Sequence, residues 1–435
     1  MDKMSKTNVD KLFTNRKQQD HEWKRFPAVR MVLFVFRVFY AWPEKGMDPS
    51  EQFRYRVKGI AFRWIVIYLS VAAQAAYICT IEKRQDLIDG LFVLSTQLVL
   101  ILKIEFLYKN ISKIQHLFYQ LDAELYASRN AEEDVPLANA RKKTSICGML
   151  YFMFSDGLIT YWLFYALTIN GLIVPSWYPF DYTASYAVYL VTLLFQVICM
   201  LWNAAFNISW DSLVYILLSL ANAQLQRLQI QLLKIGHNKR LDPEEGLQVK
   251  SKLIAVKPAP NQSGRNDHLS PVQVESAEDV YNDLLRCVIF HQKLIKFVHQ
   301  VLELFGGIIV VQLFCSVFII CIAEFHLLTE VDTVGELLCG LPYLICMLLQ
   351  VYQYCFHGNE ISYTSQKVHQ ATAFVNYPDM NIKTRKLLIL FQQRTAVGIP
   401  CYAKNIFKIE LSNATFVAII KSSYSFLAVL RTMID

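Results

Sequence analysis

Seven long apolar blocks constrain the fold of this chain more than any other feature. A helix needs roughly 20 residues to cross a bilayer, and only helices or closed barrels satisfy every backbone polar group within hydrocarbon. We therefore predict an all-α membrane protein with seven transmembrane helices. The blocks cover residues 60–80, 87–108, 146–169, 184–208, 304–322, 334–356 and 413–430.

Composition and motifs argue against catalysis. Only 18% of the 435 residues are charged, whereas a soluble chain carries about a quarter. The 10 cysteines include no CxxC pair, so a metal site is not expected. No sequence motif for a hydrolase, a nucleotide or a metalloprotease site stands in a suitable context. We expect no catalytic residue, no metal, no cofactor and no nucleic-acid partner.

The distribution of positive charge predicts the orientation. Residues 1–59, 109–145, 209–303 and 357–412 together hold 37 lysines and arginines, and the segments on the opposite side of the bilayer hold 3. Positive charge collects in cytoplasmic segments. The N-terminus is therefore expected in the cytoplasm, and after seven crossings the C-terminus lies outside. Lys103 and Glu105, at the cytoplasmic end of the second block, are expected to extend toward the membrane surface.

Apolar residues at helical spacing continue beyond several spans, which predicts long cytoplasmic helix extensions packed into an anchor domain. Residues 31–42 are too short to cross and suit an interfacial or re-entrant segment. Residues 387–400 read as a helix buried below the membrane. The expected parts are 1–59, the cytoplasmic N-terminus; 60–208, spans one to four; 209–303, helix extensions around a disordered loop, 236–279; 304–356, spans five and six; 357–412, anchor helices; and 413–435, the last span.

Aromatic and small polar residues gather in the outer halves of spans two to six. Helix packing explains most such residues, yet as a set they suit an apolar cavity with few polar groups, the usual form of a small-molecule site. The outer connections are too short for a folded ectodomain. The candidate ligand-binding residues are Ile88, Leu91, Phe92, Ser155, Leu158, Trp162, Tyr165, Tyr189, Leu193, Gln196 and Tyr343.

The C-terminal segment carries the most specific motif. Its characteristic positions are Arg385, Lys386, Arg394, Pro400, Phe407, Leu411, Phe416, Lys421, Tyr424, Ser425 and Leu430. This set resembles the C-terminal signature of the insect odorant receptors, and length, seven spans and a cytoplasmic N-terminus extend the resemblance over the whole chain. Two features depart from the family pattern: a Tyr-x-x-Trp element before the last cytoplasmic helix is not evident, and the 236–279 loop is expanded.

The resemblance implies an odorant-gated, non-selective cation channel. A tuning subunit of this family assembles with a common co-receptor as a heteromeric tetramer around one central pore. The resemblance further implies a small volatile ligand in the outer half of the bundle, and residence in the plasma membrane of a sensory-neuron dendrite or cilium. The aromatic lining favours an aromatic or heterocyclic volatile.

The last helix lines the pore in the resembling family, and one of its faces is a candidate here. Ile420, Tyr424, Leu427 and Arg431 recur at spacings of four, three and four, which places them on one side. Arg431 would be rejected by lipid and accepted by an aqueous vestibule. The alternative is that this side packs against span five or six.

Three other classes fit less well. A G-protein-coupled receptor would place its N-terminus outside and is expected to carry a DRY element, which this chain lacks. A gustatory receptor shares the fold and topology, but the last-helix string KSSYSF favours the odorant branch. A transporter is expected to show repeats or broken helices, and none is evident in the sequence.

Overall fold

The computed structural model describes residues 27–43, 47–80, 84–125, 131–235, 277–329, 333–375, 380–404 and 408–434. The loop predicted to be disordered, 236–279, lies outside these ranges up to residue 276. Its last residues belong to a helix that begins at Ala277.

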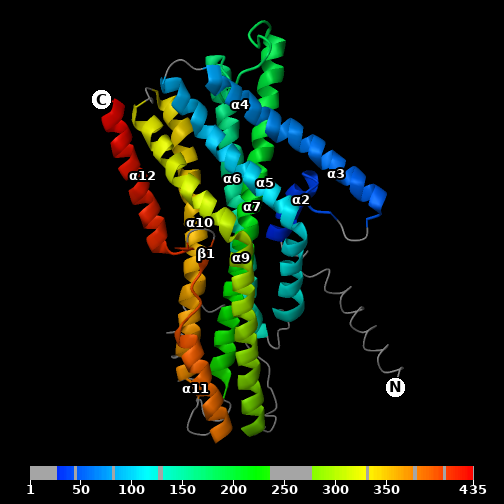
Figure 1. Cartoon of the computed structure of the whole chain (residues 1–435), viewed down its shortest axis with the longest axis vertical. Helices are drawn as coiled ribbons and strands as arrows, with labels where there is room; N and C mark the ends of the chain where they lie inside the picture. The colour runs from blue at the N-terminus through cyan, green and yellow to red at the C-terminus, as the bar shows by residue number, and fades with distance from the viewer. Residues whose placement is uncertain are drawn as a thin grey trace, which may run out of the picture.

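The described residues form a helical bundle whose two longest members run along its whole length (Figure 1). Tyr402–Lys404 (β1) pairs antiparallel with Lys408–Glu410 (β2), a small hairpin that the all-α prediction did not include. The helices are α2 (Pro27–Val38), α3 (Pro49–Arg63), the π-helical turn η2 (Trp64–Tyr68), α4 (Leu69–Thr80), α5 (Arg84–Leu125), α6 (Ala131–Ile169), α7 (Tyr186–Lys234), α9 (Ala277–Thr329), α10 (Val334–Ala373), α11 (Ile382–Ala396) and α12 (Asn413–Ile434).

Five helices of the described chain are long and apolar enough to cross a membrane: Pro49–Thr80, Glu132–Ile169, Tyr186–Lys234, Ala277–Leu328 and Val334–Ala373. The remaining two expected spans fall in α5 and α12, both helical as predicted, and α12 supplies a shorter apolar helix, Asn413–Val429. The chain is therefore an all-α membrane protein. The assignment of α5 and α12 as spans rests on the sequence.

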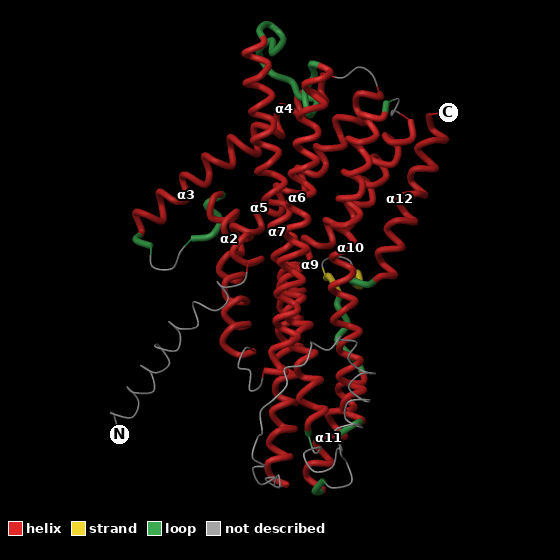
Figure 2. Tube along the Cα trace, turned by 180° about the vertical axis from the view of Figure 1, so that it is seen from behind, coloured by secondary structure: helices red, strands yellow, loops and turns green. Residues whose placement is uncertain are grey.

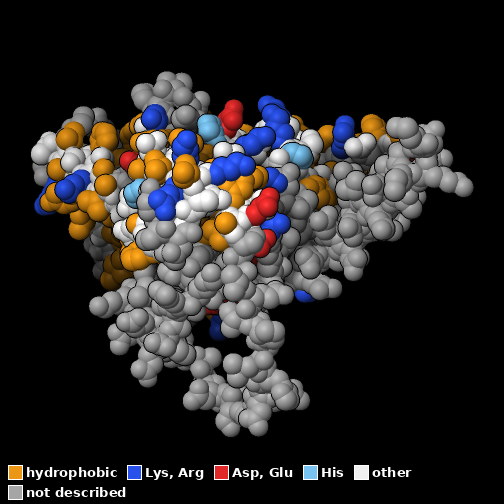
Figure 3. All heavy atoms as spheres, turned by 90° about the horizontal axis from the view of Figure 1, so that it is seen from below, with side chains coloured by type: hydrophobic (Ala, Val, Ile, Leu, Met, Phe, Trp, Pro, Cys, Tyr) orange, Lys and Arg blue, Asp and Glu red, His pale blue; other side chains and the backbone are white. Residues whose placement is uncertain are grey.

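The two longest helices extend far beyond the thickness of a membrane. With 49 residues in α7 and 53 in α9, each measures roughly 70–80 Å at ~1.5 Å per residue, whereas the hydrocarbon core is about 30 Å thick. The predicted helix extensions are therefore present. They run to the end of the molecule that carries α11 (Figure 1), and on the coloured surface of that end Lys and Arg side chains are widespread (Figure 3).

The short segment 31–42 forms α2 and the turn after it, and it packs inside the chain. α2 contacts α6 and α7. Phe36 and Phe39 are fully buried, and both rings lie against Phe206 of α7. α2 is therefore held by aromatic packing on the bundle, while α3 leans away from it (Figure 1).

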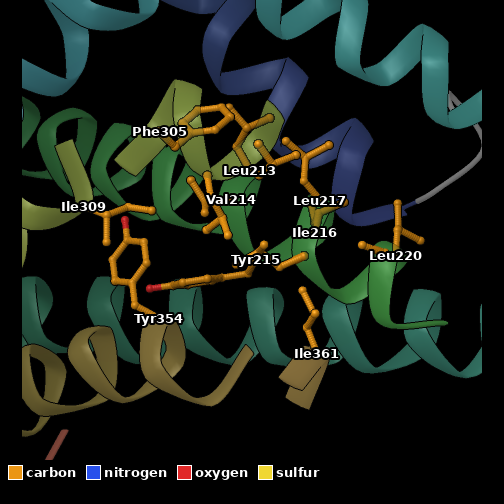
Figure 4. Packing of buried hydrophobic residues seen from close by; sticks show 14 of the residues in the cluster. Leu213, Val214, Tyr215, Ile216, Leu217, Leu220, Phe305, Ile309, Tyr354 and Ile361 are labelled. Atoms are coloured by element: carbon orange, nitrogen blue, oxygen red, sulfur yellow. The ribbon is translucent and has the colours of Figure 1, made fainter. Parts of the chain in front are cut away.

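The centre of the molecule is packed by large side chains of α7, α9 and α10. Tyr215 of α7 and Tyr354 of α10 meet edge to face, with ring centroids 5.0 Å apart, and Tyr354 is fully buried. Figure 4 shows these two rings between the helices, with Phe305 and Ile309 of α9 nearby. Such edge-to-face pairs add to the stability given by apolar burial. This core separates the outer half of the bundle from the anchor.

The helix expected at 387–400 differs from the prediction. α11 begins earlier, at Ile382, where the side chain of Asn381 caps it by accepting a hydrogen bond from the Thr384 N–H at 2.8 Å. It packs on α9 and α10 through one side only. Leu388 and Phe391 are buried, while Ile389 and Leu390 are exposed. The helix is thus amphipathic and not fully buried, because the anchor covers a single side of it.

A buried histidine holds the contact between α9 and α11. The ring of His291 meets Phe391 edge to face, with centroids 5.4 Å apart. Burial, and to a lesser extent the nearby Arg394 guanidinium, lowers the pKa of His291 to about 4. The side chain is therefore neutral at cytosolic pH, as an apolar contact requires.

Candidate functional site

A cavity of about 100 Å³ lies between four helices in the outer part of the bundle. Its lining is mainly apolar, with a few amide and hydroxyl groups. α5 contributes Val93, Thr96, Gln97 and Leu100; α6 contributes Tyr151, Ser155, Leu158, Ile159 and Trp162; α7 contributes Met200, Asn203, Ala204, Asn207 and Ile208; and α10 contributes Tyr343, Cys346 and Met347.

Four of the candidate ligand residues line this cavity. Ser155, Leu158 and Trp162 come from one side of α6, and Tyr343 comes from α10. Trp162 stacks on Tyr343 with centroids 6.0 Å apart. Its indole N–H donates to the Cys339 carbonyl at 3.1 Å, which fixes the ring as a wall of the cavity.

The other candidates lie outside this lining. The side chains of Ile88 and Phe92 are not among those the structure describes. Leu91 lies two residues before Val93, the first lining residue of α5, and its carbonyl accepts a hydrogen bond from the Ser95 hydroxyl. The hydroxyl of Tyr165 reaches Glu336 at the start of α10, at 3.4 Å.

Tyr189, Leu193 and Gln196 form a separate structure beneath the outer connection between α6 and α7. Tyr189 and Leu193 pack on Ala166 of α6. The Gln196 amide accepts from the Ile173 N–H at 3.1 Å and donates to the Val174 carbonyl at 2.9 Å. The Tyr189 hydroxyl donates to the Gly171 carbonyl at 3.1 Å, so the polar atoms of Tyr189 and Gln196 are already bonded to the outer connection and hold it in place.

Sequence reasoning missed the contribution of α7. Met200, Asn203 and Asn207 lie on one side of that helix, at spacings of three and four, and they face the cavity. The pattern was readable, because two asparagines one turn apart inside an apolar span are costly in a membrane and mark a functional site by default.

A buried polar network lies directly beneath the cavity. The ammonium of Lys103 donates to Asn207 Oδ1 at 2.6 Å and to Asp211 Oδ1 at 2.7 Å. Both side chains of the Lys103–Asp211 ion pair are fully buried. The expectation that Lys103 extends to the membrane surface is therefore wrong, because Asp211, one turn beyond the predicted end of span four, offers it a partner inside the bundle.

The network continues across α10 to α9. The Gln350 amide and the Tyr354 hydroxyl both donate to the Asp211 carboxylate. Gln350 in turn accepts from the Gln312 amide of α9 at 3.1 Å. Hydrogen bonds thus connect a cavity-lining side chain, Asn207, with α9.

α12 packs on α9 at the edge of the upper bundle (Figures 1 and 2). Among the side chains described on α12, Ile419, Ser423 and Leu427 are buried, and Leu427 forms a cluster with Cys321 and Phe325 of α9. Tyr424 is 68% exposed. Of the four candidate pore residues, Ile420 is half-buried, Tyr424 and Arg431 are exposed, and Leu427 lies against α9.

Comparison with known proteins decides the family. A family model described as 7tm Odorant receptor matches residues 84–424. The chain belongs to this odorant receptor family. It is 32% identical to odorant receptor Or1 of Anopheles gambiae over 407 residues, which cover 92% of this chain and 94% of that one. It is 22% identical to odorant receptor 46a, isoform A, of Drosophila melanogaster, over 85% of this chain and 88% of that one.

The fold of this odorant receptor also matches a solved one. The insect olfactory receptor OR5 from Machilis hrabei superposes with a TM-score of 0.71 over 92% of this chain and 97% of that chain, at 12% identity. A second structure of OR5, in complex with eugenol, matches with the same TM-score. The resemblance stated from the C-terminal motif is thus confirmed. The relatives are odorant receptors and not enzymes, in agreement with the expectation from the sequence.

Proposed function

We propose that this odorant receptor is the ligand-binding subunit of an odorant-gated, non-selective cation channel. It works with a common co-receptor in a heteromeric tetramer, in the dendrite or cilium membrane of an olfactory neuron. The observation that carries the proposal is the apolar cavity between α5, α6, α7 and α10. The eugenol complex of OR5 supports a small volatile as the ligand.

The size of the cavity bears on how a ligand acts. At about 100 Å³ it is smaller than the ~150 Å³ void that accepts benzene in an engineered protein core. A ring-sized ligand must therefore move side chains on entry. A ligand that binds an expanded conformation more tightly than the conformation seen here shifts the population toward the expanded one. The chain of hydrogen bonds from Asn207 to Gln312 offers a route by which this conformational change reaches α9.

Filling the cavity is expected to weaken the response to ligand. Ser155→Leu adds apolar volume to the lining, so we expect the half-maximal concentration to rise tenfold or more, about 1.4 kcal/mol of binding. Trp162→Ala removes a wall and is expected to shift sensitivity by a similar factor. The measurement is current against an odorant panel in cells that express the variant with the co-receptor.

The matched control for the cavity variants is Thr160→Leu, on the exposed side of the same helix. It should leave the dose–response curve in place. Wild-type curves for both cavity variants at normal surface levels would locate the ligand elsewhere, and silence of the wild-type complex toward every volatile would contradict the channel proposal.

The pore proposal uses the side of α12 that faces away from α9. Lys421, Ser425 and Thr432 are exposed there, with Ala428 between them, at spacings of four, three and four. Small and polar side chains on one side of a helix suit contact with water and cations. We assign the conduction path to this side, flanked by the exposed Tyr424 and Arg431.

Cysteine accessibility tests this assignment. Ser425→Cys is expected to be modified by a charged thiol reagent added during odorant stimulation, and the modification should block most of the current. Leu427→Cys packs against α9 and should react far more slowly. Wild-type receptor under the same reagent gives the background from native cysteines. Faster block of Leu427→Cys than of Ser425→Cys would reverse the assignment.

A further inference from the structure

One side chain in the cavity lacks the hydrogen bonds that its burial demands. Asn203 of α7 is only 5% exposed, and neither its amide nitrogen nor its amide oxygen has a hydrogen-bond partner within the described structure. Gln97 of α5, on the same lining, is 4% exposed, and its side-chain oxygen is likewise unpartnered. Polar atoms therefore face the cavity without bonds.

Buried polar atoms without hydrogen bonds are energetically costly, which suggests that a ligand or a solvent molecule bonds to them in the cavity. A buried polar group left without a hydrogen bond costs about 1–3 kcal/mol, and more than nine in ten such groups in native proteins are satisfied. Asn203 carries two unsatisfied atoms, so an apolar residue of the same size would be more stable there in the empty state. The groups gain their bonds only when a polar atom enters the cavity.

Four other polar side chains of the lining already form hydrogen bonds within the bundle. The Thr96 and Tyr343 hydroxyls bond to each other at 2.5 Å. The Tyr151 hydroxyl donates to the Cys346 carbonyl at 3.4 Å, and Asn207 Oδ1 accepts from Lys103. Asn203, with Gln97 across the lining, is thus the group best placed to bond with a guest.

We propose that Asn203 determines specificity by binding the single polar group of a small, otherwise apolar ligand, and that it favours a hydroxyl. This inference rests on the proposed function of the cavity. A carboxamide both donates and accepts. A ligand hydroxyl can accept from the Asn203 N–H and donate to the Asn203 amide oxygen. A ligand carbonyl can only accept from the N–H, and a hydrocarbon forms neither bond. The expected order of preference is alcohol, then aldehyde or ketone, then hydrocarbon.

The size of this preference for a hydroxyl can be judged from how strongly other binding sites reject ligands that lack one. A site that hydrogen-bonds a substrate hydroxyl rejects the analogue that lacks it strongly, because its own buried groups then stay unpaired. Desolvation of the ligand hydroxyl opposes this gain. The contribution of Asn203 is therefore measured by comparing the affinity ratio of two ligands in the wild-type receptor with the same ratio in a variant that lacks the amide. The cost of desolvating each ligand is the same in both receptors and cancels.

The test compares benzyl alcohol, benzaldehyde and ethylbenzene, which have equal numbers of non-hydrogen atoms. Binding is measured by the fluorescence of Trp162, a wall of the cavity, in the purified complex with the co-receptor; Trp162→Phe shows which part of the signal arises there. Asn203→Leu is expected to lower the affinity ratio of benzyl alcohol to ethylbenzene tenfold or more, with benzaldehyde in between. Asn203→Ser, which keeps a hydroxyl, should retain part of the preference.

Met200→Leu is the matched control, because it lines the same cavity one turn away and changes no polar atom. It should shift the three ligands alike. An unchanged ratio in Asn203→Leu, with binding intact, overturns the role of Asn203 and indicates that a retained water satisfies the amide. Binding with the expected ratio but without current contradicts only the channel proposal, and lack of any Trp162 response to all three ligands contradicts both.

Discussion

Replacing Lys103 with methionine is expected to destabilise this receptor by about 3–5 kcal/mol, the usual result of removing one partner from a buried ion pair. Asp211 would lose its positively charged partner inside the bundle, and only the Gln350 and Tyr354 hydrogen bonds would remain to its carboxylate. Since whole domains are stable by only about 5–15 kcal/mol, we expect little receptor at the cell surface and a marked fall in the thermal unfolding midpoint of the purified complex.

A second substitution separates charge from packing. Lys103→Met combined with Asp211→Asn removes both charges while the asparagine oxygen still accepts from Tyr354, so we expect more than half of the lost stability to return. Glu105→Gln is the control on the same helix. It breaks an ion pair with Arg63 in which the Arg63 and Glu105 side chains are 12% and 40% exposed, so the loss should be smaller than for the fully buried Lys103–Asp211 pair. A double variant no more stable than Lys103→Met would show that the buried charge is not the cause.

Gly358→Ala is expected to be nearly as disruptive, although the change adds one methyl group. A Cβ at Gly358 of α10 would lie 2.3 Å from Leu411 Cβ and 2.5 Å from the Leu411 carbonyl oxygen. Alanine in place of a helical glycine usually gains ~0.5–1 kcal/mol. Here the clash outweighs that gain, because the obstacle includes backbone that cannot rotate away.

The clash lies where the anchor is joined to the last helix. Leu411 is buried, and its N–H donates to the Cys401 carbonyl at 2.8 Å, just before α12 begins at Asn413. Gly358→Ala must displace this segment, and overpacking costs about 1–3 kcal/mol or more. We expect a lower thermal midpoint of the complex and loss of most odorant-evoked current.

Gly157→Ala, on α6, is the matched control, because a Cβ there meets nothing within 4 Å. It should leave the unfolding midpoint unchanged or slightly raised. Wild-type stability and current in Gly358→Ala would show that α10 and the entry to α12 do not pack as closely as the structure indicates.

Much of this fold was determined by the sequence alone. Continuous apolar blocks of roughly 20 residues are long enough to cross hydrocarbon as helices, so the all-α membrane class followed directly from 60–80 and its counterparts. The extensions of α7 and α9 were readable from helical periodicity. The C-terminal motif identified the family before any contact was known. These features are local, so they do not depend on how the helices meet.

The cavity depended on tertiary structure, because helical spacing shows which residues share a side and not which neighbour that side meets. Ser155, Leu158 and Trp162 share one side of a helix and line the cavity, whereas Gln196, from the same predicted set, hydrogen-bonds the outer connection. Likewise, Leu427 shares a helical side with Tyr424 in projection, yet the packing of Cys321 and Phe325 turns it toward α9.

The fate of the buried charges shows the difference most clearly. In the sequence, Lys103 lies near the end of a predicted span, where a lysine side chain can reach the membrane surface at low energetic cost. Asp211 is 108 residues away in the chain, and no local rule joins the two. Only the crossing of α5 and α7 brings them within 2.7 Å. Composition and periodicity therefore determined which segments enter the membrane. Long-range packing decided which of their polar atoms are paired and which, as at Asn203, have no hydrogen-bond partner in the described structure.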